Sequence, residues 1–212
     1  MQRLSNSPTS GLPQPTALSL LEVLVTLTLL ATLTALTAGA LTTLASWRGL
    51  SAIQQLAADL DEARVQALAG QQEVWLTFAT VGPDAFRAYV RCTHITGVDG
   101  ERRLQPVGDW RRLPPGQVFS LAVPASQEAG RNLLTDAAAL QPVRLAGGEV
   151  AQPCLGFGAL GQLQHPALGR PLLALVEGDL HHGLPQQRYG PGPEPCRWLV
   201  LHRHTGNALL LP

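Results

Sequence analysis

The stretch ALSLLEVLVTLTLL, residues 17–30, contains one charged residue, Glu22, near the start of an apolar run. No other charged residue occurs between Leu18 and Trp47, where leucine, valine, alanine and threonine predominate. An α-helix rises about 1.5 Å per residue, so residues 23–47 are long enough to cross the roughly 30 Å hydrocarbon core of a bilayer. The run therefore predicts one transmembrane helix. A carboxylate at its start needs either headgroup water or a cation nearby.

The residues before the run predict a removable leader. Residues 1–17 are polar, contain three prolines and include Arg3. Together with Glu22 they resemble the class III signal of type IV prepilins and type II secretion pseudopilins, although this chain has Ala17 where the family usually has glycine. The resemblance implies that a prepilin peptidase cuts between Ala17 and Leu18 and methylates the new amine. Glu22 then becomes the fifth mature residue and sets axial register by facing a neighbour's terminal ammonium.

Two other interpretations of the apolar run stay open. A secretory signal peptide cut after the small residues AGA, 38–40, fits the usual cleavage pattern, and a plain signal anchor has the same span length. Against the signal peptide, Glu22 stands where basic residues are expected and the apolar run continues to Trp47. Glu22 and the removable leader favour the prepilin interpretation.

The chain beyond the run predicts an amphipathic helix over residues 50–69. Apolar residues recur there at helical spacing, the charged residues fall largely on the other face, and Gly70 is a natural terminator. One nearly continuous helix over residues 18–69 is therefore expected. The passage LAADLDEARVQALAGQQEVWLTF, 56–78, resembles the helix-to-strand passage of minor pseudopilins of the GspH and FimT class.

Residues 70–212 predict a head built mostly of antiparallel strands. Alternating or continuous apolar runs give strand candidates over residues 74–78, 86–92, 117–123, 171–177, 197–203 and 207–211. Connections rich in glycine and proline are expected over residues 99–116, 145–153 and 181–195. The predicted fold class is α+β and pilin-like: a long N-terminal helix, transmembrane in its first half and amphipathic in its second, packed on a β head.

If the head is extracytoplasmic, its three cysteines allow one disulfide, with Cys154–Cys196 the favoured pair.

Several motifs are candidate sites. GFGALG, 156–161, matches a dinucleotide-binding pattern, but no helix is expected to follow it, so a glycine-rich hairpin is favoured. His202 and His204 would share one face of a strand and are weak metal-ligand candidates, with His181 and His182 on a nearby loop. A mixture of arginine and tryptophan could contact single-stranded nucleic acid, although a solvated loop is favoured; its members are Arg102, Arg103, Trp110, Arg111 and Arg112.

The composition narrows the function. Fifteen basic residues balance fifteen acidic ones, so no global field attracts nucleic acid, and all fifteen are arginine, which excludes lysine Schiff-base chemistry and the P-loop lysine. No catalytic signature is present, so neither an enzyme nor a cofactor is expected.

The resemblance implies a minor pseudopilin or pilin-like subunit of a type II secretion or type IV pilus system. The chain would sit in the bacterial inner membrane as a single-pass protein, in contact with lipid, with its head in the periplasm. Its partners would be prepilin peptidase, an inner-membrane assembly platform and other pilins or pseudopilins. The alternatives are a DNA-binding minor pilin and a membrane-anchored metal-dependent hydrolase.

Overall fold

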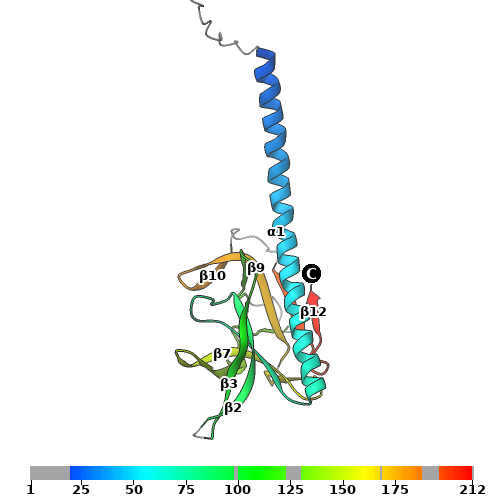
Figure 1. Ribbon diagram of the computed structural model, residues 1–212. Coiled ribbons are helices and arrows are strands. Elements are labelled where there is room, and N and C mark those ends of the chain that lie inside the picture. Colours follow the sequence, from blue (N-terminus) through cyan, green and yellow to red (C-terminus); the bar gives the residue numbers. More distant parts are fainter. Residues whose placement is uncertain (1–19, 98–99, 123–129, 168, 188–195, 212) are drawn as a thin grey trace, which may run out of the picture. The chain divides into compact units, whose positions relative to one another are not determined.

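The computed structural model describes residues 20–97, 100–122, 130–167, 169–187 and 196–211, with the side chains of residues 36–49 excepted. The elements follow in the order α1 (Leu20–Gly70), β1 (Val74–Phe78), β2 (Ala88–Thr96), β3 (Arg102–Arg112), β4 (Gln117–Phe119), β5 (Arg131–Asn132), the 3-10 turn η2 (Ala137–Ala139), β6 (Leu140–Leu145), β7 (Gly148–Phe157), β8 (Leu163–His165), β9 (Pro171–His181), β10 (Leu184–Gln187), β11 (Arg197–Leu201) and β12 (Ala208–Leu211) (Figure 1). The chain divides into two compact units, residues 1–44 and 45–212.

The first sheet closes on itself. Its strand order is β1-β2-β3-β6-β7-β8, and β1 pairs with β7 as well as with β2. The pairs are antiparallel except for β3 with β6. The interior of this ring holds a small apolar cluster made of Trp75, Val90, Cys92, Leu104, Val143 and Cys154. The ring thus has a core of its own.

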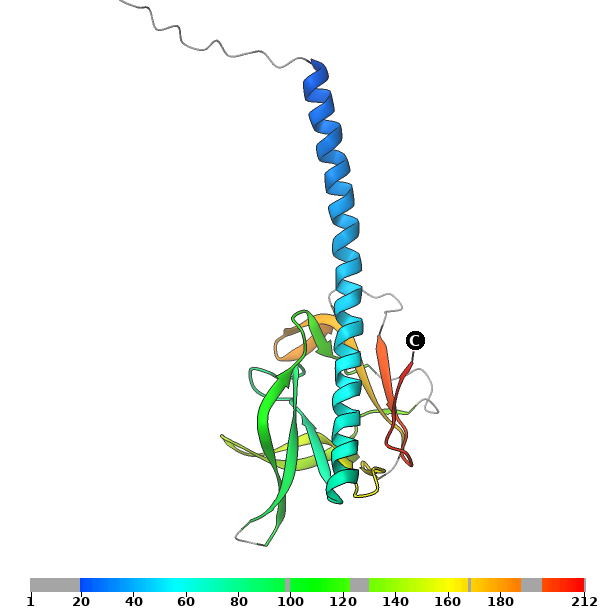
Figure 2. The same cartoon turned by 45° about the vertical axis from the view of Figure 1, so that its right-hand side comes forward.

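The second sheet carries the other strands. Its order is β10-β9-β11-β12, and β4 and β5 also pair with β9, β5 in the parallel direction. Strand β9 is central because it pairs with four other strands and its first six residues are buried. Figure 2 shows β11 and β12, in orange-red and red, on the side of α1 opposite to the green strands β2 and β3.

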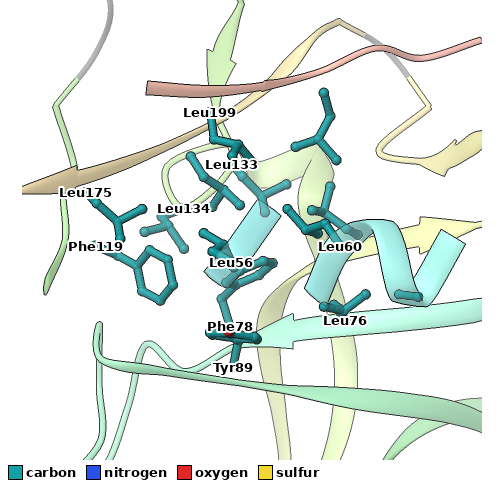
Figure 3. Packing of buried hydrophobic residues seen from close by; sticks show 14 of the residues in the cluster. Leu56, Leu60, Leu76, Phe78, Tyr89, Phe119, Leu133, Leu134, Leu175 and Leu199 are labelled. Carbon is teal, nitrogen blue, oxygen red and sulfur yellow. The ribbon is translucent and has the colours of Figure 1, made fainter. Parts of the chain in front are cut away.

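The last part of α1 lies between the two sheets and forms the main core. Its buried residues recur at helical spacing: Ala52, Ile53, Leu56, Leu60, Ala63 and Ala67. They join a cluster that includes Leu76 and Phe78 of β1 and Leu175 and Leu199 of the second sheet (Figure 3). The rings of Phe78 and Phe119 meet edge-to-face with centroids 5.4 Å apart. Burial on two sides explains why this stripe of the helix is apolar.

The prediction of a pilin-like fold with a transmembrane helix is wrong. A membrane-spanning helix needs about 20 predominantly apolar residues in one segment. Among the residues whose side chains the structure describes, no helix is both long enough and apolar enough for that. The strands of the head are mostly antiparallel, but the first sheet closes into a ring through β1 and β7, which the predicted β head did not include.

The predicted inner-membrane, single-pass location is wrong for the same reason. It depended on a span that no helix in the described part of the chain provides. The description of the chain as a pseudopilin with a transmembrane helix required that same span and is corrected with it.

The predicted elements can be compared with those observed. A helix was expected over residues 18–69, and α1 spans Leu20–Gly70. The six expected strands correspond to β1, β2, β4, β9, β11 and β12, with shifted ends. Strand β2 begins at Ala88, two residues late, because Phe86 has a φ of 56° that belongs to a turn. Three expected connections contain strands instead, namely β3, most of β7 and β10.

Candidate functional site

The first part of α1 presents an apolar surface on every side. Residues 20–35 are all exposed, and the large apolar side chains among them keep between 43% (Val23) and 85% (Leu20) of their surface accessible. A helix that is apolar all round is normally buried in a larger structure. Residues 20–35, called here the apolar helix segment, are therefore the main candidate for an assembly site.

The threonines of the apolar helix segment do not interrupt its apolar character. Thr26 and Thr28 each donate a hydroxyl hydrogen bond of 2.9 Å to the backbone carbonyl three residues earlier, and Thr32 and Thr34 bond back in the same way. Because these hydroxyls are satisfied within the helix, their methyl groups can face a partner without leaving a donor unpaired.

Glu22 lies in the first turn of α1 and is exposed. A carboxylate there interacts favourably with the partial positive charge of the helix N-terminus. Glu22 is also the one charged residue of the apolar helix segment. Ala17 and Leu18, the predicted cleavage and methylation residues, lie outside the described residues.

A second polar cluster joins α1 to the β2–β3 hairpin. Asp59 accepts hydrogen bonds from the Tyr89 hydroxyl and from the Arg111 guanidinium, and Glu62 lies 3.4 Å from Arg91 and 3.5 Å from Arg111. Burial is the main cause that raises the pKa of Tyr89 above its ordinary value, and the hydrogen bond to Asp59 and the negative charge of Asp59 raise it further. Tyr89 is thus a neutral hydrogen-bond donor at physiological pH, which suits a structural role and not that of a base.

The cavity beside this cluster is small. It measures about 230 Å³ and is lined by the same charged side chains together with Trp110 and the strand residues around it. Ligand pockets usually measure about 300–1,000 Å³. Since Asp59 and Glu62 of α1 pair with arginines of β2 and β3, we interpret the cluster as a clamp that orients α1 on the first sheet.

Replacing Asp59 by alanine is expected to lower the free energy of unfolding by about 1–3 kcal/mol, because the Tyr89 hydroxyl and Arg111 lose a shared, largely buried acceptor. Asp61→Ala is the matched control: Asp61 lies on the same helix, 61% of its side chain is exposed, and its pair with Arg64 should contribute less than about 1 kcal/mol. Urea unfolding followed by circular dichroism measures both. Equal changes in the two variants would contradict the clamp.

The predicted nucleic-acid residues lie on β3, where carboxylates pair with most of them. Arg103 is 3.2 Å from Glu101 and 3.0 Å from Glu149, and Arg112 is 2.9 Å from Asp84, which raises the pKa of Arg112. Arg102 is exposed at the start of the strand. A carboxylate at these distances competes with phosphate for the same guanidinium.

Trp110 and Arg111 are also engaged within the chain. Trp110 is half-buried and packs on the ring interior, while Arg111 belongs to the clamp. The arrangement therefore does not favour a stacking platform for bases.

The histidine candidates do not share a strand face. Strand β11 ends at Leu201, and His202 and His204 are both exposed at the turn that follows. His181 and His182 stack edge-to-face at 4.2 Å where β9 turns into β10. Among the described residues no group of three or more histidine, cysteine or acidic side chains is placed to hold a metal ion.

The glycine motif forms a hairpin, as expected. GFGALG joins β7 to β8, and its tip packs closely on the rest of the molecule. A Cβ at Gly161, where φ is +73°, would lie 2.8 Å from Leu68 Cγ, and a Cβ at Gly206 would lie 2.2 Å from the Gly161 carbonyl oxygen. The glycines thus permit close contact within the chain.

The favoured disulfide is not formed. Cys154 is a buried free thiol in the ring interior, 3.3 Å from the Thr77 hydroxyl, and Cys92 is a second buried free thiol in the same cluster. Burial raises the pKa of Cys154 to about 12 and also raises the pKa of Cys92. Both thiols are therefore neutral at physiological pH.

The sequence pattern placed Glu22 at the start of the apolar helix, as the structure does, but did not predict the clamp. Asp59 falls on the polar face of the helical pattern, and no local pattern names Tyr89 and Arg111 as its partners. Comparisons with protein-family models, with curated proteins and with solved structures give no match to this chain.

Proposed function

We propose that the chain is a structural subunit of a filament of a type II secretion or type IV pilus system, matured by a prepilin peptidase between Ala17 and Leu18. In this proposal it assembles with other pilin-like subunits into a filament through the apolar helix segment. The supporting observation is the exposure of that segment, since residues 20–35 are exposed on all sides in the single chain. The proposed work is mechanical, with no reaction catalysed.

Helix packing supplies the driving force for assembly. Full burial of one leucine or valine side chain is worth about 1.5–3 kcal/mol. The apolar helix segment contains Leu20, Leu21, Val23, Leu24, Val25, Leu27, Leu29, Leu30 and Leu33, each at least two-fifths exposed. Burial of these side chains against the helices of several neighbouring subunits offsets the free energy lost on association, which is about 4–15 kcal/mol or more. The self-bonded threonines allow this packing without unpaired hydroxyls.

Glu22 limits how neighbouring helices can align. Burying an unpaired carboxylate is strongly unfavourable, whereas a paired one is tolerated. Cleavage after Ala17 would create an ammonium at Leu18, four residues before Glu22. If that ammonium of one subunit faces Glu22 of the next, alignments that separate the two charges are penalised, so the pair sets the axial position of each subunit.

Replacing Glu22 by alanine is expected to reduce incorporation into filaments at least about tenfold, because a penalty of about 1.4 kcal/mol already shifts an equilibrium tenfold. Incorporation is measured as the fraction of the chain in filaments sheared from its own host. Asp61→Ala, which removes a carboxylate from the same helix outside the apolar helix segment, should incorporate normally. Glu22→Gln keeps the shape of the side chain but removes its charge, and this variant should also incorporate poorly.

The loss must be traced to assembly and not to folding or maturation. Loss of the favourable contact with the helix N-terminus should change stability by at most about 1 kcal/mol, so circular dichroism of the variant should match that of the parent. Mass spectrometry of both proteins from the host should show a methylated N-terminus at Leu18. Normal incorporation of Glu22→Ala, or a mature chain that keeps its first 17 residues or starts at Leu41, would contradict the proposal.

A further inference from the structure

The outermost strands of the two sheets differ in how they are protected. In the described part of the chain five strands pair with one other strand each: β4, β5, β8, β10 and β12. Strands β4 and β5 are only three and two residues long. Strand β8 is three residues long, is followed by Pro166, and has the N–H of Leu163 bonded to the Arg203 carbonyl. Strand β10 contains Pro185 and two glutamines. Short length, proline and polar residues are the usual means of blocking further strand pairing.

Strand β12 is as short as β10 and is followed by Pro212, but the strand itself contains neither a proline nor a polar side chain. Its four residues are Ala208, Leu209, Leu210 and Leu211, without charge or proline. The three leucines are 52%, 43% and 42% exposed. An uncharged edge strand with exposed leucines is a template for another strand.

The direction of the backbone groups on β12 follows from its turn. The His202 N–H bonds to the Asn207 carbonyl, and these residues stand opposite each other in the register of β11 and β12. Hydrogen-bonded and non-hydrogen-bonded pairs alternate along an antiparallel ladder. Leu209 and Leu211 therefore bond to β11, whereas the N–H and C=O groups of Ala208 and Leu210 face the edge of β12 that no other described strand occupies, called here the open edge.

We propose that β12 pairs with β12 of a second copy of this chain, antiparallel and about a two-fold axis at Leu209. In this register Ala208 stands opposite the second copy's Leu210, and the two positions exchange N–H···O=C bonds in both directions. A register centred on Leu210 would place Ala208 opposite Pro212, which has no N–H to donate. The occupant is a second copy because the strand is self-complementary: it carries no charge, and leucine meets leucine across the axis.

The paired edges would join the outer faces of two second sheets. Leu209 and Leu211 lie on the face opposite to the buried Leu199 and Leu201, next to Val200 and Trp198. Side chains directly opposite in a non-hydrogen-bonded pair approach most closely, so Leu209 contacts its own counterpart. This contact goes beyond the proposed filament and does not depend on Glu22 or the apolar helix segment.

Disulfide trapping in the full-length chain tests the register. In the proposed pair the two Leu209 Cα atoms are about 4.5 Å apart, within the range that a disulfide bridges. The two Leu211 positions are separated by four residues along the strand, about 13 Å, which is too far. Leu209→Cys is therefore expected to form cross-linked dimers about tenfold faster than Leu211→Cys under mild oxidation, a ratio equivalent to about 1.4 kcal/mol. The unsubstituted chain is the control, and its cross-linking rate gives the contribution of the native cysteines.

A second variant guards against accidental contact. Leu210→Pro in the Leu209→Cys background removes an N–H that faces the open edge and leaves the bonds to β11 in place, so cross-linking should be lost while circular dichroism is kept. Equal rates for Leu209→Cys and Leu211→Cys would mean non-specific association and would overturn the proposal. Cross-linking that survives Leu210→Pro would overturn it too. Glu22→Ala should not alter the ratio, which separates this proposal from the filament.

Discussion

Leu60→Ala is expected to lower the free energy of unfolding by about 3–5 kcal/mol. Leu60 is fully buried in the last part of α1, where the helix contacts both sheets (Figure 3). Removal of a leucine side chain from such a site loses its transfer free energy and leaves a cavity that neighbouring strands cannot close. The neighbours are held by strand pairing on both sides of the helix, so little relaxation is available.

Val65→Ala is the matched control for Leu60→Ala. Val65 lies on the same helix but is 54% exposed, so its truncation should change the free energy of unfolding by less than about 1 kcal/mol. Urea titration followed by tryptophan fluorescence measures both variants. A Leu60→Ala change no larger than that of Val65→Ala would mean that the helix does not pack between the sheets.

Stability is expected to fall steeply at alkaline pH because of three buried acids. Burial raises the pKa of Cys154 from 9.0 to about 12 and raises those of Cys92 and Tyr89 as well. In the unfolded chain the thiols lose their protons near pH 9 and the tyrosine near pH 10, while the folded chain keeps them. The stabilisation is complete below pH 9 and is lost as the pH rises toward the folded values. Cys154 alone accounts for up to about 4 kcal/mol between pH 9 and 12.

Thermal unfolding under reducing conditions, from pH 7 to pH 11, tests the expected loss of stability at alkaline pH. Cys154→Ala should have a lower melting temperature than the parent at pH 7. Its melting temperature should fall less than the parent's between pH 9 and 11, because one of the three titrating groups has been removed. Cys196→Ala removes a thiol that is only partly buried and should keep the parent's slope. A melting temperature that stays constant between pH 9 and 11, or identical slopes for the two variants, would rule out buried titrating thiols.

The helix and about half of the strands could be predicted because their signals are local. Helix α1 is apolar on every side in its first part and has one apolar stripe in its last part. Both patterns can be recognised from the helical spacing of residues within one stretch of sequence. Strand β1 alternates because Leu76 and Phe78 face the main core while Trp75 faces the ring interior and Thr77 faces Cys154. The strands β9, β11 and β12 were predicted from continuous apolar runs, which are just as local.

The missed strands have patterns that local reasoning assigns to loops. Strand β3 contains Pro106 and Gly108 and has one fully buried residue, Leu104, yet it pairs with β2 along most of its length. Strand β7 contains Pro153 and Gly156 and lacks alternation in its second half, because Cys154 faces the ring interior while Leu155 and Phe157 face the main core. Burial on both faces removes the period of two on which strand prediction depends.

The amino-acid order of this chain was sufficient for the helix, for its two differing parts and for the position of Glu22, since each depends on neighbours a few residues apart. Closure of the first sheet through β1 and β7 required the folded chain, because it brings Thr77 beside Cys154 across 77 positions. The clamp of Asp59, Tyr89 and Arg111 likewise joins residues 30 and 52 positions apart. Such contacts arise from the packing of whole elements, and no short stretch of sequence specifies its distant partner.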